Sequence, residues 1–358
     1  MHPPLVARCV RGLESVLAAE ILDRGLGTVT ALRHRAVHFA VHFGPTARAP
    51  RPRTADDVFL LAAQGGDPGR TKPDLTALTG LADRTDPGRL LSRRRALLPA
   101  ADRPTGIDVS ASFLGRRTFS RYDAEDAVGT VLARRLGLPY HSRRTGEAPP
   151  PGTWGWRLTL DGGHATLMAR IDDRPAHRRP YKHRTVPGTL HPPVAAALAA
   201  LADLRPGHTV LDPCCGAGTL LIEAALTRPG VHCHGFDLSP GAVAAARANA
   251  RSLPVTVRRS DAGRLPVPDG FADRVLCNPP WGAQVRPGGV LAADPSRWWA
   301  EVRRVLAPDG TAVLLLPDPA ALTDAVRHRL TPVHVQRVRL AGAQPFVVLL
   351  RPDEGRLA

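Results

Sequence analysis

Short apolar runs alternate with helical stretches from about residue 191 almost to the end of the chain. The runs have the length and composition of buried strands, while the segments between them are rich in alanine and other helix formers. This alternation predicts a parallel sheet joined by right-handed helical crossovers. The predicted strands lie near 208–212, 231–236, 255–259, 273–277 and 311–316, and the predicted helices near 194–204, 219–226, 240–251, 295–307 and 319–329. Two last strands, 333–339 and 345–350, predict an antiparallel end to a sheet of about seven strands.

Four successive predicted strands each end in a polar side chain. The four residues are Asp212, Asp237, Asp261 and Asn278. The carboxyl ends of parallel strands meet at one edge of a sheet, where open α/β proteins bind their ligands, so these side chains are expected to share a site. Each acid alone is also compatible with a helix cap or a loop residue, but their regular placement favours the shared site.

The loop after the first of these strands predicts the kind of ligand. Gly216 and Gly218 allow a ligand to approach the backbone closely. Leu221 stands where a dinucleotide fingerprint needs its third glycine, and no Gly-Lys-Ser/Thr follows as in a P-loop. The loop therefore suits a nucleoside without a pyrophosphate. Asp237, about 20 residues further on, is placed to bind ribose hydroxyls. Asp261 could accept a hydrogen bond from an adenine amino group.

A rigid polar corner follows the fourth strand, in the sequence Cys-Asn-Pro-Pro-Trp-Gly over residues 277–282. Asn278 precedes a proline and is therefore expected to be extended. Pro279 and Pro280 have fixed φ angles and no N–H, so their carbonyls should point outward. The Asn278 amide oxygen and the Pro279 carbonyl could hold the two hydrogens of an exocyclic amine while Trp281 stacks on the base. The alternative is an ordinary β-turn with a chance pair of prolines.

The charge of the chain is unevenly distributed. Its 48 basic and 32 acidic residues give a formal net charge of +16. Residues 1–190 hold 30 basic and 18 acidic residues, whereas residues 191–358 hold 18 and 14. Abundant Arg, Ala, Pro and Gly would also follow from a GC-rich genome. The asymmetry is more informative than the total, and it indicates that one half holds a polyanion while the other does chemistry.

The pattern of the basic half, residues 1–190, predicts two α+β segments. Residues 5–43 predict a strand, a helix and a strand, and residues 106–171 predict a strand, an amphipathic helix at 123–136 and a hairpin. Between them, residues 44–105 are rich in Pro, Gly and Arg, with short helices expected at 55–63 and 75–81. The run Arg93-Arg94-Arg95 is expected to be a solvated charge run.

Two basic segments are candidates for nucleic-acid contact. Residues 115–122 interleave arginines with aromatics, and residues 177–184 form a basic connector ahead of the predicted sheet. Such side chains suit phosphates and unpaired bases, although a solvated loop and a flexible charged linker are the alternatives. The residues predicted to contact RNA are Arg116, Arg117, Arg121, Arg178, Arg179 and Lys182.

The two motifs Asp-Pro-Cys-Cys-Gly-Ala-Gly-Thr, from Asp212, and Asn-Pro-Pro-Trp-Gly, from Asn278, together resemble those of class I S-adenosylmethionine-dependent methyltransferases. They look more specifically like the RNA methyltransferases that carry a THUMP domain and modify guanine at N2. Residues 179–194 are similar to that family's linker, and residues 11–14 with the following helix look like its N-terminal ferredoxin-like start.

The resemblance implies an α/β fold, with a C-terminal Rossmann-like class I methyltransferase sheet of seven strands after an α+β ferredoxin-like and THUMP RNA-binding region. The implied limits are 1–50 for the ferredoxin-like part, 51–175 for the THUMP-like domain, 176–190 for the linker and 191–358 for the methyltransferase domain.

The resemblance further implies S-adenosylmethionine as cofactor and structured RNA as substrate, most specifically the acceptor stem of tRNA. The implied cofactor residues are Pro187, Gly188, Thr189, Leu190, Asp212, Cys214, Gly216, Gly218, Asp237, Leu238, Asp261, Ala262 and Asn278. The implied catalytic residues are Asn278, Pro279, Pro280 and Trp281, the last replacing the family's usual Tyr or Phe. A guanine-N2 methyltransferase of 23S rRNA, a DNA amino-methyltransferase and a non-catalytic RNA-binding protein are the alternatives.

The remaining expectations concern what the chain lacks. No apolar run approaches the ~18 residues that span a bilayer, and the N-terminus does not have the pattern of a signal peptide. The five cysteines include no C-x-x-C, which argues against a zinc site and for a reducing compartment. His34, His38 and His42 share a strand face, but an ordinary polar face is the preferred interpretation. The sequence thus predicts a cytoplasmic, monomeric enzyme without a metal.

Overall fold

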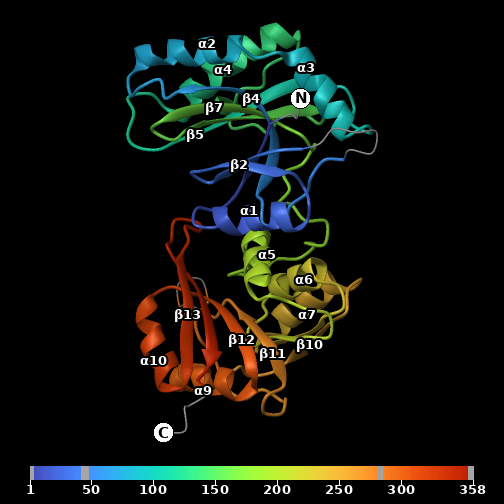
Figure 1. The fold of residues 1–358 in the computed structure, drawn as a ribbon, viewed down its shortest axis with the longest axis vertical. Helices are drawn as coiled ribbons and strands as arrows, with labels where there is room; N and C mark the ends of the chain where they lie inside the picture. The colour runs from blue at the N-terminus through green and yellow to red at the C-terminus, as the bar shows by residue number, and fades with distance from the viewer. Residues whose placement is uncertain (1–3, 42–47, 281, 283–284, 354–358) are drawn as a thin grey trace. The chain divides into compact units, whose positions relative to one another are not determined.

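The computed structural model describes residues 4–41, 48–280, 282 and 285–353, and the chain divides into two compact units. The first unit takes the N-terminus up to Arg8 together with Ile21–Ala176. The second unit takes Cys9–Glu20 together with the chain from His177 onward. Each unit is built on its own seven-stranded sheet (Figure 1).

The sheet of the first unit has the order β2-β3-β1-β4-β7-β6-β5. Its strands are β1 (Pro4–Arg8), β2 (Thr28–Arg33), β3 (Ala36–Ala40), β4 (Asp57–Gly66), β5 (Gly106–Phe113), β6 (Thr153–Leu160) and β7 (His164–Arg170). Only the β5–β6 pair is parallel, and the predicted hairpin is the antiparallel pair β6–β7. Helices α2 (Leu75–Asp83), α3 (Pro87–Leu97) and α4 (Arg121–Leu136) lie over one face of this sheet (Figure 1).

Helix α4 shows how local sequence sets these elements. Ser120 caps its N-terminus by accepting a hydrogen bond from the Asp123 N–H, and the Asp123 carboxylate in turn accepts one from the Ser120 N–H. This is the reciprocal capping box that satisfies two free donors at a helix start. Gly137 ends the helix with a φ of 65°, a left-handed conformation that glycine adopts without steric cost.

The expected helix at residues 55–63 is wrong, because this segment belongs to strand β4. Leu60 pairs with Leu5 of β1 on one side and with Ala169 of β7 on the other. A short apolar run cannot be assigned from periodicity alone, and here the two flanking strands decide its conformation. The same pairing places β1 and β4, which lie on either side of residues 50 and 51 in the sequence, in one sheet.

The sheet of the second unit has the order β10-β9-β8-β11-β12-β14-β13. Its strands are β8 (Thr209–Asp212), β9 (His232–Asp237), β10 (Val255–Arg259), β11 (Ala272–Cys277), β12 (Leu306–Leu316), β13 (Leu330–Arg337) and β14 (Phe346–Pro352). The first five are parallel, and β14 runs antiparallel to both β12 and β13. The predicted seven-stranded sheet with an antiparallel end is therefore confirmed.

Two apolar clusters pack the two faces of this second sheet. One includes α5 (Pro192–Leu201), α6 (Thr219–Thr227) and α7 (Pro240–Ala250), and the other includes α8 (Val290–Ala293), α9 (Ser296–Val305) and α10 (Leu322–Arg327). The first cluster also contains Leu13 and Val16 of α1 (Glu14–Asp23) and the turn before it, far away in sequence. The Gln336 amide donates to the Gly12 carbonyl, and the Arg339 N–H donates to the Arg11 carbonyl at 3.0 Å.

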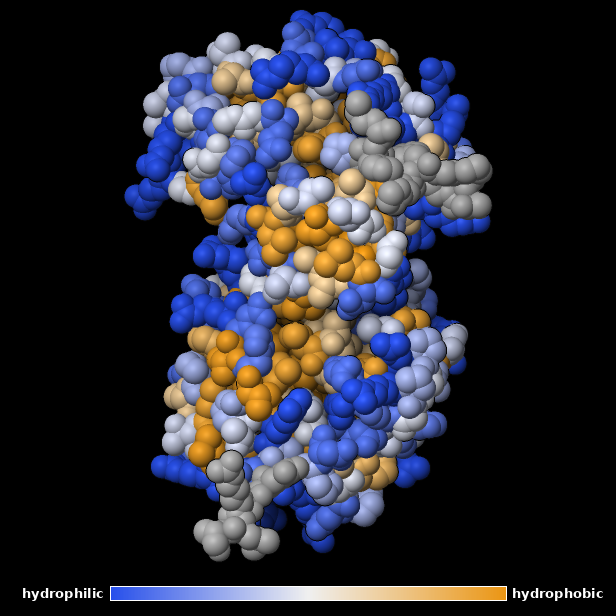
Figure 2. Space-filling model, in the orientation of Figure 1, coloured by the Kyte–Doolittle hydropathy of each residue, from blue (hydrophilic) through white to orange (hydrophobic). Residues whose placement is uncertain are grey.

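The hydropathy of the surface differs between the helices of the first unit and the edge strand β13. In the view of Figure 2 the helices of the first unit carry mostly hydrophilic side chains. Apolar side chains reach the surface over the edge strand β13, where Val333 and Val335 are 49% and 45% exposed (Figure 2). Among the residues that the structure describes, no helix is long and apolar enough to cross a membrane.

Candidate active site

The strand order of the second unit brings the predicted polar residues to one edge. Strands β9 and β11 flank β8 on either side, and β10 follows β9. Asp212 lies beside Gly235 across the β8–β9 pair, and Asp237 lies beside Arg259 across the β9–β10 pair. Because these strands are parallel, their ends converge at the carboxyl edge, as the alternation of strands and helices predicted.

Asp212, at the end of the central strand β8, is only 1% exposed. Its carboxylate accepts a hydrogen bond from the Cys214 N–H at 3.1 Å and contacts the thiol of Cys277. Burial raises the pKa of Asp212 to about 7, and the nearby Asp237 adds to the effect, whereas the two hydrogen bonds oppose it. A cation beside a buried carboxylate stabilises its ionised form.

The two glycines of the loop have different surroundings. Gly216 has a φ of 52°, and a Cβ added there would meet no atom closer than the Val186 Cγ2 at 3.9 Å, so the backbone is open on this side. Gly218 has a φ of 80°, and its added Cβ would lie 3.2 Å from the Cβ of Ala246 on α7. Gly216 therefore leaves room for a ligand, while Gly218 allows close helix packing.

Asp237 fixes the glycine loop to the end of β9. Its Oδ2 accepts a hydrogen bond from the Gly216 N–H at 2.9 Å, and its Oδ1 accepts one from the Ser239 N–H at 2.9 Å. Each carboxylate oxygen keeps a second lone pair for a hydroxyl donor. Leu238, the next residue, is 40% exposed beside this carboxylate. The contact of Asp237 with a ribose diol stays a prediction.

Asp261 joins two loops. Its Oδ1 accepts from the Gly263 N–H and its Oδ2 from the Val290 N–H, both at 2.9 Å, so it fastens the turn after β10 to the start of α8. Ala262 beside it is 7% exposed. Both carboxylate oxygens thus support loop structure, a role that the sequence did not reveal, and each keeps a second lone pair, as in Asp237.

Asn278 follows β11 and is held by the linker. Its amide nitrogen donates to the Gly188 carbonyl in a long hydrogen bond of 3.4 Å, which turns the amide oxygen away from Gly188. The Thr189 hydroxyl closes the turn that presents this carbonyl, donating to the Val186 carbonyl at 2.6 Å and accepting from its N–H at 2.8 Å. Pro279 and Pro280 are half-buried next to Asn278, and the predicted stacking residue, Trp281, lies outside the described residues.

Not every predicted linker residue faces this site. Pro187 is exposed, and Gly188 and Thr189 are half-buried. Leu190 is 7% exposed and packs in the apolar cluster with α5, so its contact is with the core.

Two buried polar residues anchor the linker and were missed. Glu223 of α6 is fully buried and accepts from the Arg179 guanidinium at 3.0 Å and from the Tyr181 hydroxyl at 2.7 Å. Asn249 of α7 is 4% exposed and bonds the backbone of His183 and Arg184. A signal was present in the sequence, because Glu223 stands alone in an apolar helix and Asn249 and Asn278 are the only two asparagines.

The predicted RNA-contacting residues divide into two groups. Arg116, Arg121 and Arg178 are exposed and Lys182 is half-buried, with burial lowering the pKa of its ammonium group. The side chain of Arg117 is 2% exposed and pairs with Asp67 at 2.6 Å, and the side chain of Arg179 is 10% exposed and pairs with Glu223. These two arginines depart from the expectation, because buried ion pairs leave their guanidinium groups little access to a phosphate.

Arg94 likewise departs from the expected solvated run. It is 4% exposed, and its guanidinium donates to Asp173 at 2.5 Å and to the Ile171 carbonyl at 3.0 Å. The arginine therefore fastens α3 to the chain that follows β7.

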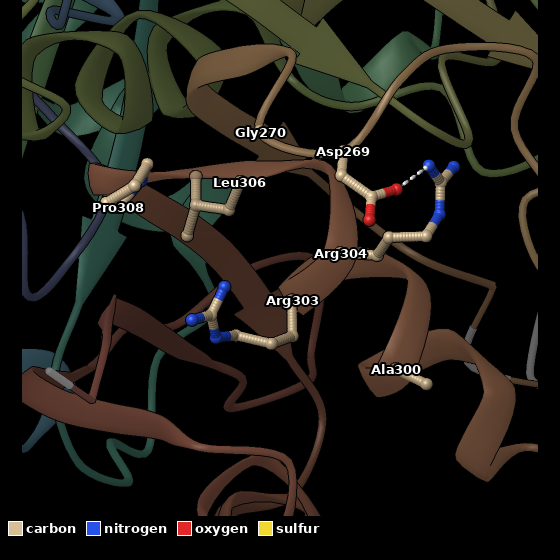
Figure 3. A pocket seen from close by; sticks show the side chains of 7 residues that line it. All are labelled: Asp269, Gly270, Ala300, Arg303, Arg304, Leu306 and Pro308. Atoms are coloured by element: carbon tan, nitrogen blue, oxygen red, sulfur yellow. Dashed lines mark hydrogen bonds and ion pairs between the residues drawn. The ribbon is translucent and has the colours of Figure 1, made fainter. Parts of the chain in front are cut away.

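A cavity of about 690 Å³ lies away from this site (Figure 3). Gly270 and Leu306, which line it, stand at the amino ends of β11 and β12, whereas the polar residues stand at the carboxyl ends. The Arg304 guanidinium at its rim donates to Asp269 at 2.8 Å (Figure 3). Strand direction thus separates this cavity from the strand-end residues.

A metal site has no support in the part of the chain that the structure describes, where no group of three or more His, Cys, Asp or Glu side chains could hold an ion. The histidine set of the first unit includes His42, which lies outside that part.

The strand-end residues fit S-adenosylmethionine. Asp237 offers a carboxylate to a ribose diol, and the open side of Gly216 leaves room beside the loop. The buried Asp212, with a pKa raised to about 7, suits a cationic ligand such as a sulfonium or an ammonium group.

Comparison with known proteins gives a consistent assignment. Residues 179–345 match the family described as RMKL-like, methyltransferase domain. The tRNA (guanine(6)-N2)-methyltransferase of Thermus thermophilus is 32% identical over 280 residues, which cover 75% of this chain and 80% of that protein. The U6 snRNA (guanine-N(2))-methyltransferase THUMPD2 of Bos taurus is 31% identical over 177 residues, which cover 46% of this chain but 34% of that protein.

Solved structures give the same fold over nearly the whole chain. TrmN from Thermus thermophilus matches with a TM-score of 0.74 and 28% identity, covering 98% of this chain and 100% of that one. SMU.472 in complex with SAH matches with a TM-score of 0.69 and 16% identity, covering 98% of each chain. The predicted class I methyltransferase fold, the methyltransferase activity and the S-adenosylmethionine cofactor are confirmed, and the chain belongs to the family of RMKL-like methyltransferase-domain proteins.

Proposed function

We propose that this enzyme transfers a methyl group from S-adenosylmethionine to the N2 amine of a guanosine in RNA, with the acceptor stem of tRNA as its substrate. The observation that carries the proposal is the placement of Asn278. It stands at the end of β11, next to the strand that ends in Asp212, and the Gly188 carbonyl fixes its amide nitrogen. The relatives from Thermus thermophilus and Bos taurus are named as guanine-N2 methyltransferases, which supports the same target atom.

Asn278 and Pro279 hold the acceptor nitrogen in this proposal. With the Asn278 nitrogen donating to Gly188, its amide oxygen is left to accept one hydrogen of the target amine, and the Pro279 carbonyl accepts the other. S-adenosylmethionine supplies a methyl group that is already activated on a sulfonium sulfur. Aiming the amine lone pair is therefore most of what the protein contributes, and such positioning is worth several orders of magnitude in rate.

The proton that leaves the methylated amine needs no buried base. Solvent can take it, because an alkylated ammonium on a purine ring is strongly acidic. Asp212 bonds the Cys214 N–H and the Cys277 thiol, and it is assigned to the cofactor side of the site. The target guanosine must leave its base stack to reach Asn278, at a cost of roughly a few kcal/mol.

Three exposed arginines and one half-buried lysine are proposed to hold the RNA backbone. Arg116 and Arg121 in the first unit and Arg178 and Lys182 in the linker are the assigned contacts. The Arg121 guanidinium lies over the Tyr122 ring at 4.7 Å from its centroid, an arrangement that also suits stacking on an unpaired base. Each phosphate contact that is lost should reduce the salt dependence of RNA binding by about one unit of slope.

The experiment is methyl transfer from labelled S-adenosylmethionine to total RNA of a strain lacking this gene, followed by nucleoside analysis. N2-methylguanosine in the tRNA fraction supports the proposal. Label in 23S rRNA keeps the reaction and changes the substrate, and label in DNA alone overturns the proposed substrate class.

We also propose that the enzyme is a monomer and needs no metal. Sedimentation of the active enzyme tests the first proposal, and full activity in the presence of a chelator tests the second. The RNA substrate and the five free thiols support action in the cytoplasm.

A further inference from the structure

The side chain of Asn249 uses its full hydrogen-bonding capacity inside the second unit. Its Oδ1 accepts from the backbone N–H groups of His183 at 3.0 Å and of Arg184 at 2.9 Å. Its Nδ2 donates to the carbonyls of Arg184 at 2.9 Å and of Ala217 at 3.0 Å. An asparagine amide offers two donor hydrogens and two acceptor lone pairs, so all four are satisfied.

The partners of Asn249 come from two segments that both belong to the site. Ala217 lies in the glycine loop between Gly216 and Gly218, while His183 and Arg184 lie in the linker. Neither segment belongs to α7, the helix that carries Asn249. One side chain therefore ties the cofactor loop to the linker.

The linker continues from Arg184 to the residue that holds Asn278. Two residues further on, Val186 begins the turn that the Thr189 hydroxyl and N–H close, and Gly188 in this turn accepts from the Asn278 amide. The bonded path thus runs from the glycine loop through Asn249 and the turn to Asn278. Every member of this path belongs to the second unit.

A purely structural role is the alternative for a buried asparagine. An asparagine that served only its own helix would be expected to bond backbone groups within that helix. Alanine would also suit this position better by helix propensity, in a helix that already contains several alanines. All four hydrogen bonds of the Asn249 side chain go to the two site segments, which points to alignment of the site.

We propose that Asn249 is a positioning residue, which fixes the linker turn and thereby Asn278 relative to the cofactor loop. The proposal rests on the role given to Asn278 in the proposed function. A displacement of the amine-holding group by about 1 Å is enough to reduce the rate of transfer by roughly a hundredfold. Loss of Asn249 should therefore lower the rate of transfer far more than it lowers cofactor affinity.

The test compares Asn249→Ala with Val302→Ala. Val302 is 1% exposed in α9, in the other apolar cluster, so its truncation lowers stability without touching the linker. Single-turnover methyl transfer is measured at saturating S-adenosylmethionine and RNA, per folded enzyme, together with cofactor affinity. Asn249→Ala should lose about a hundredfold in rate, with cofactor Kd changed by less than about tenfold and Val302→Ala within twofold of wild type. Equal rates in the two variants would overturn the proposal.

A second variant covers the case in which Asn249→Ala does not fold. Thr189→Val removes the hydroxyl that closes the turn while keeping its size, and Thr189→Ser retains the hydroxyl. Thr189→Val should be slowed at least tenfold, and Thr189→Ser should recover most of the wild-type rate. Equal rates for Thr189→Val and Thr189→Ser would show that the turn closed by the Thr189 hydroxyl does not position Asn278, and would overturn the proposal.

Amide hydrogen exchange separates this proposal from the proposed function. In Asn249→Ala the amides of His183 and Arg184 lose their acceptor, and the loosening should extend to the Thr189 amide, which donates to the Val186 carbonyl at 3.0 Å. A Thr189 amide that stays as protected as in Val302→Ala would overturn the positioning role even if wild-type enzyme methylated no RNA. Wild-type protein that methylates no RNA, with exchange spreading as expected, would overturn the proposed substrate alone.

Discussion

The Oδ2 atom of Asp237 accepts a hydrogen bond from the Gly216 N–H at 2.9 Å, and this bond sets the position of the glycine loop over the end of β9. The Ser239 N–H occupies the other carboxylate oxygen at 2.9 Å. Asp237 therefore shapes the loop and presents its remaining lone pairs to the cofactor at the same time.

Asp237→Asn should weaken S-adenosylmethionine binding by ten- to a hundredfold, in line with loss of a charge-assisted hydrogen bond of about 1.5–3 kcal/mol. An amide presents an NH₂ group to one of the two N–H donors, so the loop also loses a partner. The measurement is calorimetric titration with the cofactor. Asp273→Asn is the matched control, because Asp273 makes a similar carboxylate–amide bond to the Thr209 N–H at 2.7 Å at the opposite end of the strands. Equal cofactor affinities in the two variants would contradict the assignment.

Asn278→Ala should reduce the rate of methyl transfer by at least a hundredfold, because the amine loses one of its two acceptors and its aim. The free energy of unfolding should change by less than about 1 kcal/mol, since the hydrogen bond from Asn278 to the Gly188 carbonyl is long, at 3.4 Å. The measurement is single-turnover transfer alongside urea unfolding. Unchanged turnover on purified RNA, with the variant folded, would refute the role of Asn278.

The pH dependence of stability should reveal Asp212. Its pKa in the folded protein is about 7, against 3.8 as the ordinary value. Between these values the unfolded chain has released the proton and the folded chain still holds it, so the stability contributed by Asp212 is present below about pH 4 and is lost as pH rises to 7.

Asp212→Asn removes this titration and should become more stable relative to wild type as pH rises from 4 to 8, by up to about 4 kcal/mol. The measurement is urea unfolding of both proteins across this range, in which other titrating groups cancel in the difference. A difference in unfolding free energy that stays constant with pH would show that Asp212 titrates normally.

Arg116 and Arg117 are neighbours with opposite expected effects. Arg117→Ala should destabilise the first unit by about 3 kcal/mol, because it leaves the Asp67 carboxylate without its ion-pair partner. Arg116→Ala should leave thermal unfolding unchanged and weaken RNA binding, with a shallower dependence on salt. Thermal unfolding and RNA titration at several salt concentrations measure both. A stable Arg117→Ala, or unaltered RNA binding in Arg116→Ala, would each contradict the expectation.

The strand-end residues could be predicted from the sequence because their placement follows from chain direction. Once the parallel alternation is recognised, Asp212, Asp237 and Asn278 must meet at one edge. Their partners could not be predicted, because they come from distant segments. The Val290 N–H that bonds Asp261 and the Gly188 carbonyl that bonds Asn278 lie 29 and 90 positions away.

The errors in the first unit have the same physical origin. Leu60 lies in a run that fits a helix as well as a strand, and only its pairing with Leu5 and Ala169 decides. Arg117 has the sequence context of a solvated basic loop, but its guanidinium forms a buried ion pair with Asp67, 50 positions earlier.

In the second unit, Asn249 carried a usable signal, since an asparagine inside an alanine-rich helix is expected to have a buried hydrogen-bond partner.

The bond between Gln336 and the Gly12 carbonyl joins residues 324 positions apart. Leu13 and Val16 complete the apolar cluster of the second unit, although the ribosome makes them long before the strands that they accompany. During synthesis the bonds of this segment to Gln336 and Arg339 can form only when the last strands have emerged, so the second unit cannot mature while the chain is incomplete. A fragment that begins at His177 would lack this segment, and an isolated catalytic piece should aggregate unless residues 9–20 are supplied.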